Sequence, residues 1–336
     1  MIDAILSFSV RQRWLVMVGA LLMAALGAWN FTRLPIDAVP DITNVQVQIN
    51  TNAPGYSPLE VEQRITFPIE TAMGGLPNLL NTRSLSRYGL SQVTVVFKDG
   101  TDIYFARQLV NERVQQVKDA LPAGIETVMG PVSTGLGEIY MYTVEAKGNA
   151  EGASGKPYTP SDLRTIQDWI IKPQLRNVPG VNEVNTIGGF EKQFHVMPDP
   201  GKLMAYRLSF RDVMTSLAAN NANVGAGYIE KNGEQYLVRT PGQVVNLEEI
   251  GQIVIGSRNG VPVRIADVAD VREGTDLRTG AATHDGREVV LGTTMLLIDE
   301  NGRTVAQRVA EKLKQIERSL PEGVSIRAIY DRTHLI

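Results

Sequence analysis

The longest apolar stretch of the chain lies near its N-terminus, where Arg13 and Arg33 bracket 19 residues without a charge. As an α-helix rising about 1.5 Å per residue, this stretch would span about 28 Å, close to the bilayer hydrocarbon core of about 30 Å. Trp14 at one end and Phe31 at the other are residue types typical of the lipid–water interface. We predict one transmembrane helix over about residues 12–32.

The charges around this stretch indicate its orientation. Arg11 and Arg13 precede it and Asp37 follows it, so the positive-inside rule favours a cytoplasmic N-terminus with the remaining chain exported. A cleavable signal peptide is the main alternative, because Ala25-Leu26-Gly27 resembles a cleavage site, and a buried core helix is the third. A retained transmembrane helix and a cleaved signal peptide both place the large polar part of the chain outside the cytoplasm.

Helix-spaced apolar positions reveal an internal repeat. Val110–Ile125 and Val309–Val324 match at an offset of 199, and each reads as a helix stopped by Leu-Pro-x-Gly and followed by a strand. A weaker match at offset 102 relates Val61–Thr82 to Leu163–Val184. The offsets differ by 97, so the second copy is predicted to carry an insertion of that length near residues 188–285.

Each copy reads β-α-β-β-α-β, the order of a ferredoxin-like split β-α-β unit in an α+β protein. The first copy is predicted to contain strands near Val45–Asn50, Leu79–Arg87, Leu90–Lys98 and Ile125–Met129, and helices near Pro58–Met73 and Asp102–Leu121. The second is predicted to contain strands near Ile139–Glu145, Val181–Ile187, Val289–Asp299 and Val324–Tyr330, and helices near Ser161–Arg176 and Gly302–Leu320. Because helices cover only one face of such a sheet, we expect the two units to pack together.

The predicted domains follow from these patterns. They are an N-terminal segment with the transmembrane helix (1–33), a first ferredoxin-like unit (34–136), a second unit in two pieces (137–187 and 286–336), and a small α+β insert (188–285). Within the insert, Asn232-Gly233 between alternating residues predicts a β-hairpin over 226–239. Its Tyr228 and Tyr236 would either pack on the insert itself or meet a partner.

Composition narrows the class of protein. The chain has 336 residues, 43% of them apolar and 21% charged, which is ordinary for a folded protein. Its 33 basic and 36 acidic residues give a net charge of −3, so we expect no nucleic-acid partner. The absence of cysteine removes thiol nucleophiles and cysteine metal sites, and no P-loop, H-E-x-x-H or G-x-S-x-G motif occurs. We therefore expect neither an enzyme nor a bound cofactor.

Candidate metal ligands are few. His195, His284 and His334 are far apart, and the ten methionines are scattered as core fillers usually are. Glu138 is the exception, because it follows Gly135-Leu136-Gly137 where the first unit passes into the second. A carboxylate there suits a hard or borderline divalent cation, but from the residues alone a solvated charge at the start of a strand is the favoured explanation.

The stretch from Leu34 to Arg113, LPIDAVPDITNVQVQINTNAPGYSPLEVEQRITFPIETAMGGLPNLLNTRSLSRYGLSQVTVVFKDGTDIYFARQLVNER, and the Arg-x-Arg-Trp before the apolar run resemble a known family. The whole chain resembles the N-terminal part of the heavy-metal efflux family of resistance–nodulation–division (RND) transporters, of the cobalt–zinc–cadmium resistance type. The resemblance implies a trimeric proton antiporter of the Gram-negative inner membrane with the first helix retained. It implies that the repeated units are porter subdomains, and that the insert is a docking subdomain whose hairpin reaches the neighbouring protomer.

The resemblance also implies partners and a cargo. A periplasmic adaptor and an outer-membrane channel would complete the export path, and the proton-carrying acids of the family would lie beyond Ile336, so a fragment of this length should not pump alone. The copper/silver branch resembles this chain but has an aromatic residue in place of Glu138, so the carboxylate looks like the divalent branch, which exports zinc, cobalt, cadmium or nickel. A copper/silver or drug efflux relative, and a membrane-anchored assembly or binding module, remain the alternatives.

Overall fold

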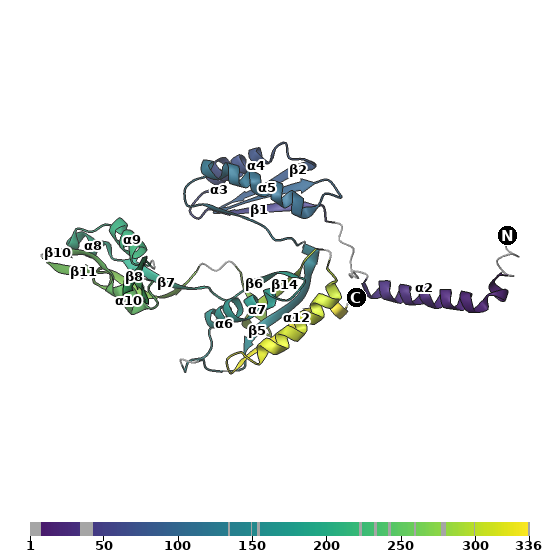
Figure 1. Cartoon of the computed structure of the whole chain (residues 1–336). Coiled ribbons are helices and arrows are strands. Elements are labelled where there is room, and N and C mark those ends of the chain that lie inside the picture. The colour runs from purple at the N-terminus through teal and green to yellow at the C-terminus, as the bar shows by residue number, and fades with distance from the viewer. Residues whose placement is uncertain are drawn as a thin grey trace. The chain divides into compact units, whose positions relative to one another are not determined.

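The computed structural model (Figure 1) has the α+β architecture that the sequence predicts. It describes residues 8–33, 43–133, 135–148, 150–152, 155–221, 224–231, 234–240, 243–258, 260–276, 280–298 and 300–334. The chain divides into two compact units, one formed by Met1–Pro157, Gln167–Thr186 and Leu291–Ile336, the other by Tyr158–Ile166 and Ile187–Val290.

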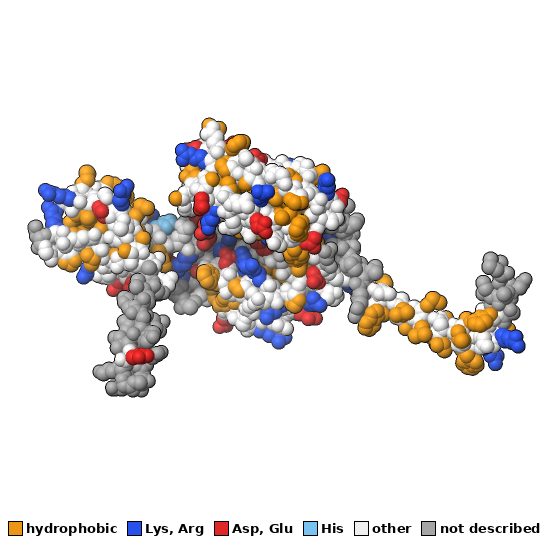
Figure 2. Space-filling model, turned by 45° about the horizontal axis from the view of Figure 1, so that its top comes forward, with side chains coloured by type: hydrophobic (Ala, Val, Ile, Leu, Met, Phe, Trp, Pro, Cys, Tyr) orange, Lys and Arg blue, Asp and Glu red, His pale blue; other side chains and the backbone are white. Residues whose placement is uncertain are grey.

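The predicted apolar helix is present as α2 (Arg13–Arg33). From Arg13 to Phe31 it is long and apolar enough to cross a membrane, a requirement that a signal sequence near an N-terminus would also meet. Its apolar side chains are exposed, as the orange side chains along this helix in Figure 2 show. The helix therefore has the length and the surface expected of a lipid-facing segment.

The first sheet has four antiparallel strands in the order β2-β3-β1-β4. Its strands are β1 (Gln46–Asn52), β2 (Leu79–Arg87), β3 (Leu90–Phe97) and β4 (Glu126–Met129). Its helical segments are α3 (Pro58–Val61), the π-helical η1 (Glu62–Thr66), α4 (Phe67–Met73), α5 (Ile103–Val117) and the 3₁₀ turn η2 (Lys118–Ala120). Helices α3, α4 and α5 cover one face of the sheet (Figure 1).

Local chemistry explains where these helices begin. Ser57 caps α3 in a capping box with Glu60, whose carboxylate accepts the backbone N–H of Ser57 at 3.0 Å, and Pro58 occupies the first helical position. Asp102 caps α5 with its side chain alone, since its carboxylate accepts the backbone N–H of Phe105 at 2.7 Å. Because alternate residues of β1 are buried, Val47 and Ile49 join the helices in one hydrophobic core.

The second sheet repeats this strand order. Its strands are β5 (Glu138–Ala146), β6 (Val181–Ile187), β14 (Arg287–Leu296), β15 (Val324–Asp331) and the short β13 (Ala282–His284). The order is β13-β14-β5-β15, and β6 also pairs with β14. The series β6-β14-β5-β15 thus corresponds to β2-β3-β1-β4. The pairing of β6 with β14, predicted by the difference between the two repeat offsets, is present.

The helices of this part repeat as well. They are η3 (Gly135–Gly137), α6 (Pro160–Ile166), the π-helical η4 (Gln167–Ile171), α7 (Lys172–Arg176), α12 (Gly302–Glu317) and η5 (Arg332–His334). Buried side chains lie at Val61, Ile65, Ile69, Met73 and Leu76 in the first copy, and at Leu163, Gln167, Ile171, Leu175 and Val178 in the second. Each buried position of the first copy thus has a buried counterpart 102 residues later, which is the predicted offset. The counterpart of Ile65 is Gln167, so the second copy has a buried glutamine where the first has an isoleucine.

The insert contains short helices and two-stranded sheets. Its elements are β7 (Lys192–Pro198), α8 (Pro200–Tyr206), α9 (Phe210–Ala219), β8 (Val224–Lys231), β9 (Glu234–Thr240), α10 (Leu247–Gln252), β10 (Val254–Arg258), β11 (Val261–Arg264), α11 (Ile265–Val268) and β12 (Ala269–Thr275). Strand β7 pairs with β12, β10 with β11, and β8 with β9. The β8–β9 pairing matches the predicted hairpin, whereas its Asn232-Gly233 turn and the side chains of Tyr228 and Tyr236 lie outside the described residues.

Candidate functional site

Glu138 is the first residue of β5 and directly follows the short turn η3. Its side chain is exposed, whereas Ile139 beside it is fully buried. The turn is held against the end of β14, because a Cβ atom added to Gly137 would lie 3.4 Å from the carbonyl oxygen of Leu296. The carboxylate is therefore presented to solvent from a fixed position.

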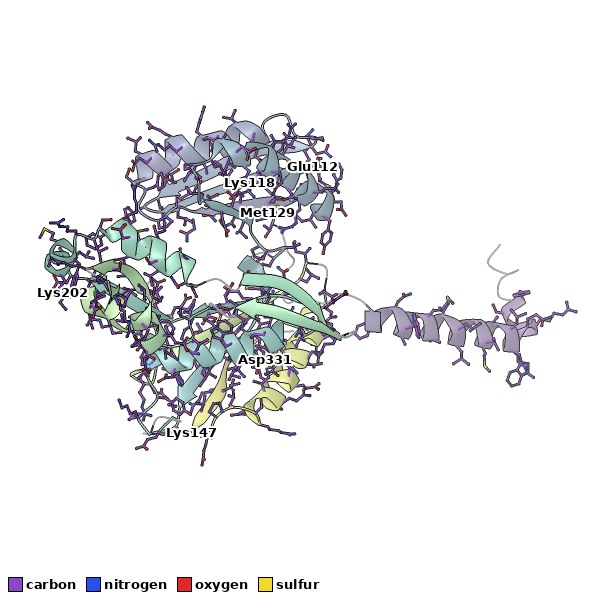
Figure 3. All side chains as sticks on the ribbon, turned by 60° about the vertical axis from the view of Figure 1, so that its left-hand side comes forward. Glu112, Lys118, Met129, Lys147, Lys202 and Asp331 are labelled. Carbon is purple, nitrogen blue, oxygen red and sulfur yellow. The ribbon has the colours of Figure 1, made fainter. Side chains whose placement is uncertain are left out.

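A buried arginine stabilises the backbone that precedes Glu138. Arg332, at the start of η5, is only 4% exposed, and its Nη1 donates to the carbonyl oxygen of Leu136. The neighbouring Asp331 (Figure 3) ends β15 and accepts hydrogen bonds from Thr333, at 2.9 Å from the backbone N–H and 2.7 Å from the hydroxyl. Both charged groups are thus engaged in local structure around the turn.

Two tyrosines of β5 are uncharged at neutral pH. Burial, with a further contribution from the charge of Asp331, raises the pKa of Tyr140. Burial also raises the pKa of Tyr142, which is fully enclosed. Neither phenol is therefore placed to supply a phenolate ligand to a cation.

Further along β5, a network of polar side chains connects the second sheet to its helix. The hydroxyl of Tyr142 lies 3.1 Å from Oε1 and 3.0 Å from Nε2 of Gln167, and Thr186 donates to Asp168 at 2.7 Å. Sequence reasoning missed this network, because Gln167 occupies a position where helical spacing predicts an apolar residue. The available signal was Gly292 in β14, where a Cβ atom would collide with the ring of Tyr142.

Glu138 alone does not make a metal site. Among the described residues no cluster of three or more His, Cys, Asp or Glu side chains could hold a metal ion. Since bound Zn²⁺ takes four ligands and other divalent cations often more, Glu138 could supply one ligand of a site completed by groups outside the described residues. No arrangement within them resembles a resident metal centre.

Among the described residues, no histidine belongs to a cluster that could hold a metal ion. The Nε2 atom of His195, on β7, lies 3.3 Å from Oε1 of Gln193, and its ring packs on Gly274. His284 ends β13, 3.8 Å from the carboxylate of Asp285. The structure does not describe the side chain of His334.

The two methionines near the junction of the repeated units are placed as partly buried packing residues. Met129 (Figure 3) ends β4 and packs against the first core, and Met141 is half-buried on β5.

Comparison with known proteins shows the family to which the chain belongs. A profile described as the AcrB/AcrD/AcrF family matches residues 5–336. The chain is 66% identical over 336 residues to protein HelA of Legionella pneumophila, and 62% identical to the cobalt-zinc-cadmium resistance protein CzcA of Cupriavidus metallidurans. It is 41% identical over 338 residues to the cation efflux system protein CusA of Escherichia coli (strain K12). In each case all of this chain is covered.

A solved structure agrees with these relatives. The X-ray crystal structure of a heavy metal efflux pump (crystal form II) matches with a TM-score of 0.87 and 31% identity, covering 98% of this chain. This chain covers 32% of that structure's chain and 32% of each of the three relatives. The sequence therefore spans about one third of the length of the proteins it matches.

Proposed function

The chain belongs to the AcrB/AcrD/AcrF family, and from that premise we propose that it is the N-terminal portion of a heavy-metal cation/proton antiporter of the RND superfamily. The observation that carries the proposal is the match of 98% of the chain, at a TM-score of 0.87, to a heavy metal efflux pump. The chain would act within a longer protein and would not pump alone. A metal ion would be its cargo, and a proton gradient would supply the energy.

We propose divalent cations, namely zinc, cobalt, cadmium or nickel, as the cargo. Identity to the cobalt-zinc-cadmium resistance protein is 62%, against 41% to the cation efflux system protein CusA. The exposed carboxylate of Glu138 supports the same choice, because carboxylate oxygens suit hard and borderline cations better than Cu(I) or Ag(I). Glu138 would supply one ligand along the export path, and parts of the protein beyond this chain would supply the rest.

The architecture supports further assignments within this proposal. The recurring strand order favours two ferredoxin-like porter subdomains, of which the second is interrupted by a docking subdomain. The β8–β9 hairpin would contact the neighbouring protomer of a homotrimer. Helix α2 would span the inner membrane with its N-terminus in the cytoplasm and the bulk of the chain in the periplasm. An adaptor and an outer-membrane channel would complete the assembly.

The proposal is tested with the complete gene in a metal-sensitive host, by measuring tolerance to zinc, cobalt, cadmium, nickel, copper and silver. Glu138→Gln is compared with wild type at equal protein level in the membrane. Glu126→Gln is the matched control, because Glu126 is also an exposed carboxylate at the first position of a strand. The isosteric change removes a charge but almost no volume, so folding should be unaffected.

We expect wild type to confer tolerance to divalent metals, Glu138→Gln to lose part of it, and Glu126→Gln to retain all of it. The loss should be partial because an amide oxygen still coordinates weakly and other ligands remain. Tolerance limited to copper and silver would contradict the divalent assignment. Full tolerance of Glu138→Gln to every divalent metal would reduce Glu138 to a solvated charge at the start of a strand.

A further inference from the structure

The insert begins at two consecutive glycines that have no free space around them. Gly188 and Gly189 follow β6 and both have positive φ angles, +84° and +65°. A Cβ atom on Gly188 would lie 2.7 Å from the carbonyl oxygen of Val289, and one on Gly189 would lie 2.6 Å from the carbonyl oxygen of Pro160. Both positions therefore require glycine for conformation and for space. A glycine pair between two lobes often indicates a flexible hinge, but these two are packed tightly.

The N-terminal turns of α6 bind this segment directly. Nη1 of Arg164 donates to the carbonyl oxygen of Gly188 at 2.9 Å, and Oγ of Ser161 donates to the carbonyl oxygen of Phe190 at 3.0 Å. A Cβ atom on Gly189 would lie 2.8 Å from Cβ of Arg164. One turn of helix thus contacts three consecutive residues at the point where the insert starts.

The start of α6 is itself fixed. The backbone N–H of Thr159 donates to the carboxylate of Asp162 at 2.9 Å, and the N–H of Asp162 donates back to the Thr159 hydroxyl at 3.2 Å. This reciprocal arrangement is a capping box. Ser161 and Arg164 are therefore held by a helix end that does not fray easily.

The segments of the chain that enter and leave the insert are hydrogen-bonded to each other just beyond the glycines. The N–H of Asp276 donates to the carbonyl oxygen of Glu191 at 3.0 Å, and from Lys192↔Thr275 onward β7 and β12 pair continuously. A salt bridge of 2.8 Å between Lys192 and Glu273 adds to this pairing. A fixed entry point therefore fixes both strands that lead into the insert.

Helix α6, which makes these contacts, passes directly into the π-helical segment η4. Residues up to Ile166 group with the insert, and residues from Gln167 group with the other compact unit. Gln167 is also where the α-helix becomes the π-helical η4. Because π segments in helices often mark functional sites and irregular backbone, this junction is the natural place for the helix to bend.

We propose that Ser161, Arg164 and the pair Gly188–Gly189 form a clamp that joins the insert and α6 into one rigid body. The glycine pair would then act as a packed joint and not as a flexible hinge. The clamp does not depend on which ion the protein transports. A displacement of α6 would therefore move the insert with it.

Spin-label distance measurements on the complete protein test the clamp. This chain contains no cysteine, so labels at Thr165→Cys on α6 and Lys202→Cys on α8 (Figure 3) are unique once cysteines elsewhere in the protein are replaced. Both positions are exposed. The variant that removes both hydrogen bonds, Ser161→Ala with Arg164→Ala, is compared with the labelled wild type.

Gly189→Ala is the second variant, and Gly286→Ala is its matched control. Gly286 also has a positive φ, +74°, and lies in the same compact unit, but nothing lies within 4 Å of the added Cβ. It therefore reproduces the backbone strain of a positive φ without the collision. If Gly189→Ala does not accumulate, the hydrogen-bond variant decides the outcome.

We expect a single narrow distance distribution in wild type and in Gly286→Ala. The hydrogen-bond variant and Gly189→Ala should give a distribution about twofold broader, or a second distance, because local opening of the joint becomes accessible. Distributions as narrow as wild type in the hydrogen-bond variant would overturn the clamp. This readout needs no transport, so it can fail or succeed independently of the proposed metal export.

Discussion

Replacing Tyr142 by phenylalanine removes one hydroxyl from the interior of the second sheet. Tyr142 and Gln167 are both fully buried, and the hydroxyl lies 3.0 Å from Nε2 and 3.1 Å from Oε1 of the amide. The amide's other described contact is long, 3.5 Å from Nε2 to the hydroxyl of Thr186. Without the phenol, a buried amide is left short of partners, which costs about 1–3 kcal/mol. We expect Tyr142→Phe to destabilise this region by about 2 kcal/mol, since no larger rearrangement is needed.

A double-mutant cycle separates the loss of the hydrogen bond from other effects. Gln167→Leu alone should also be destabilising, because it leaves the hydroxyl of Tyr142 buried and unpaired. Tyr142→Phe combined with Gln167→Leu removes both polar partners, so the pair should cost less than the sum of the single changes by about 1–2 kcal/mol. A sum that is simply additive would show that the two side chains are not coupled.

Hydrogen exchange followed by mass spectrometry is the assay, because it reports on each part of a multidomain protein separately. A local destabilisation of about 2 kcal/mol corresponds to roughly 30-fold faster exchange of the amides that depend on it. Peptides from β5 should show this acceleration, while peptides from β1, the equivalent strand of the first sheet, should not change. Unchanged exchange of β5 in Tyr142→Phe would refute the reasoning.

Three further predictions address other parts of the chain. A periplasmic reporter fused after residue 50 should be active, because α2 is expected to direct the residues after it across the membrane, whereas a mature N-terminus near Ala28 would indicate a cleaved signal peptide. The pKa of Asp212 lies below its ordinary value because the backbone N–H and hydroxyl of Ser209 donate to its carboxylate, so its stabilising contribution is present above the ordinary pKa and lost as the pH falls through the lowered one. Asp212→Asn should therefore weaken the acid dependence of exchange in α9 below the ordinary carboxyl pKa of about 4, and an unaltered pH profile would contradict this. Gly292→Ala should destabilise β14 by about 1–3 kcal/mol through overpacking, measured as faster exchange in β14 with β3 as the internal reference.

Most of the secondary structure could be predicted because it is encoded locally. Helix-spaced apolar residues and Leu-Pro-x-Gly stops identify α5 and α12, which begin and end within a few residues of the predicted positions. The one long-range feature that could be predicted, the pairing of β6 with β14, came from comparing two repeat offsets and not from either strand alone. Repetition supplied the tertiary information that a single copy would have lacked.

The π-helical segments could not be predicted from apolar spacing. A π turn adds a residue to one turn of a helix that otherwise has helical periodicity, so the pattern on either side remains intact. Each segment ends two residues before a proline, Pro68 after η1 and Pro173 after η4. A proline ring clashes with the carbonyl four residues earlier in a regular helix, and widening the preceding turn relieves that clash.

The candidate site was predictable only in part. The predicted strand near Ile139–Glu145 placed Glu138 at its start, and the exposure of Glu138 agrees with the alternative of a solvated charge as well as with a path ligand. The contact of Arg332 with the turn could not be predicted, because nearly 200 residues separate the two in sequence. Such contacts depend on the sheet being assembled, and no local pattern encodes them.

The placement of the insert also has a consequence for synthesis of the protein. Strand β1 finds its partners β3 and β4 by residue 129, whereas β5 pairs only with β14 and β15, which begin at Arg287 and Val324. About 140 residues separate the end of β5 from the start of β14, and at about 5–20 residues per second a ribosome needs roughly 7–28 s to make them. During that time the β5 segment has been made, but neither of these partner strands is available to pair with it. The second sheet is therefore the part of the nascent chain that most needs protection from aggregation or premature pairing.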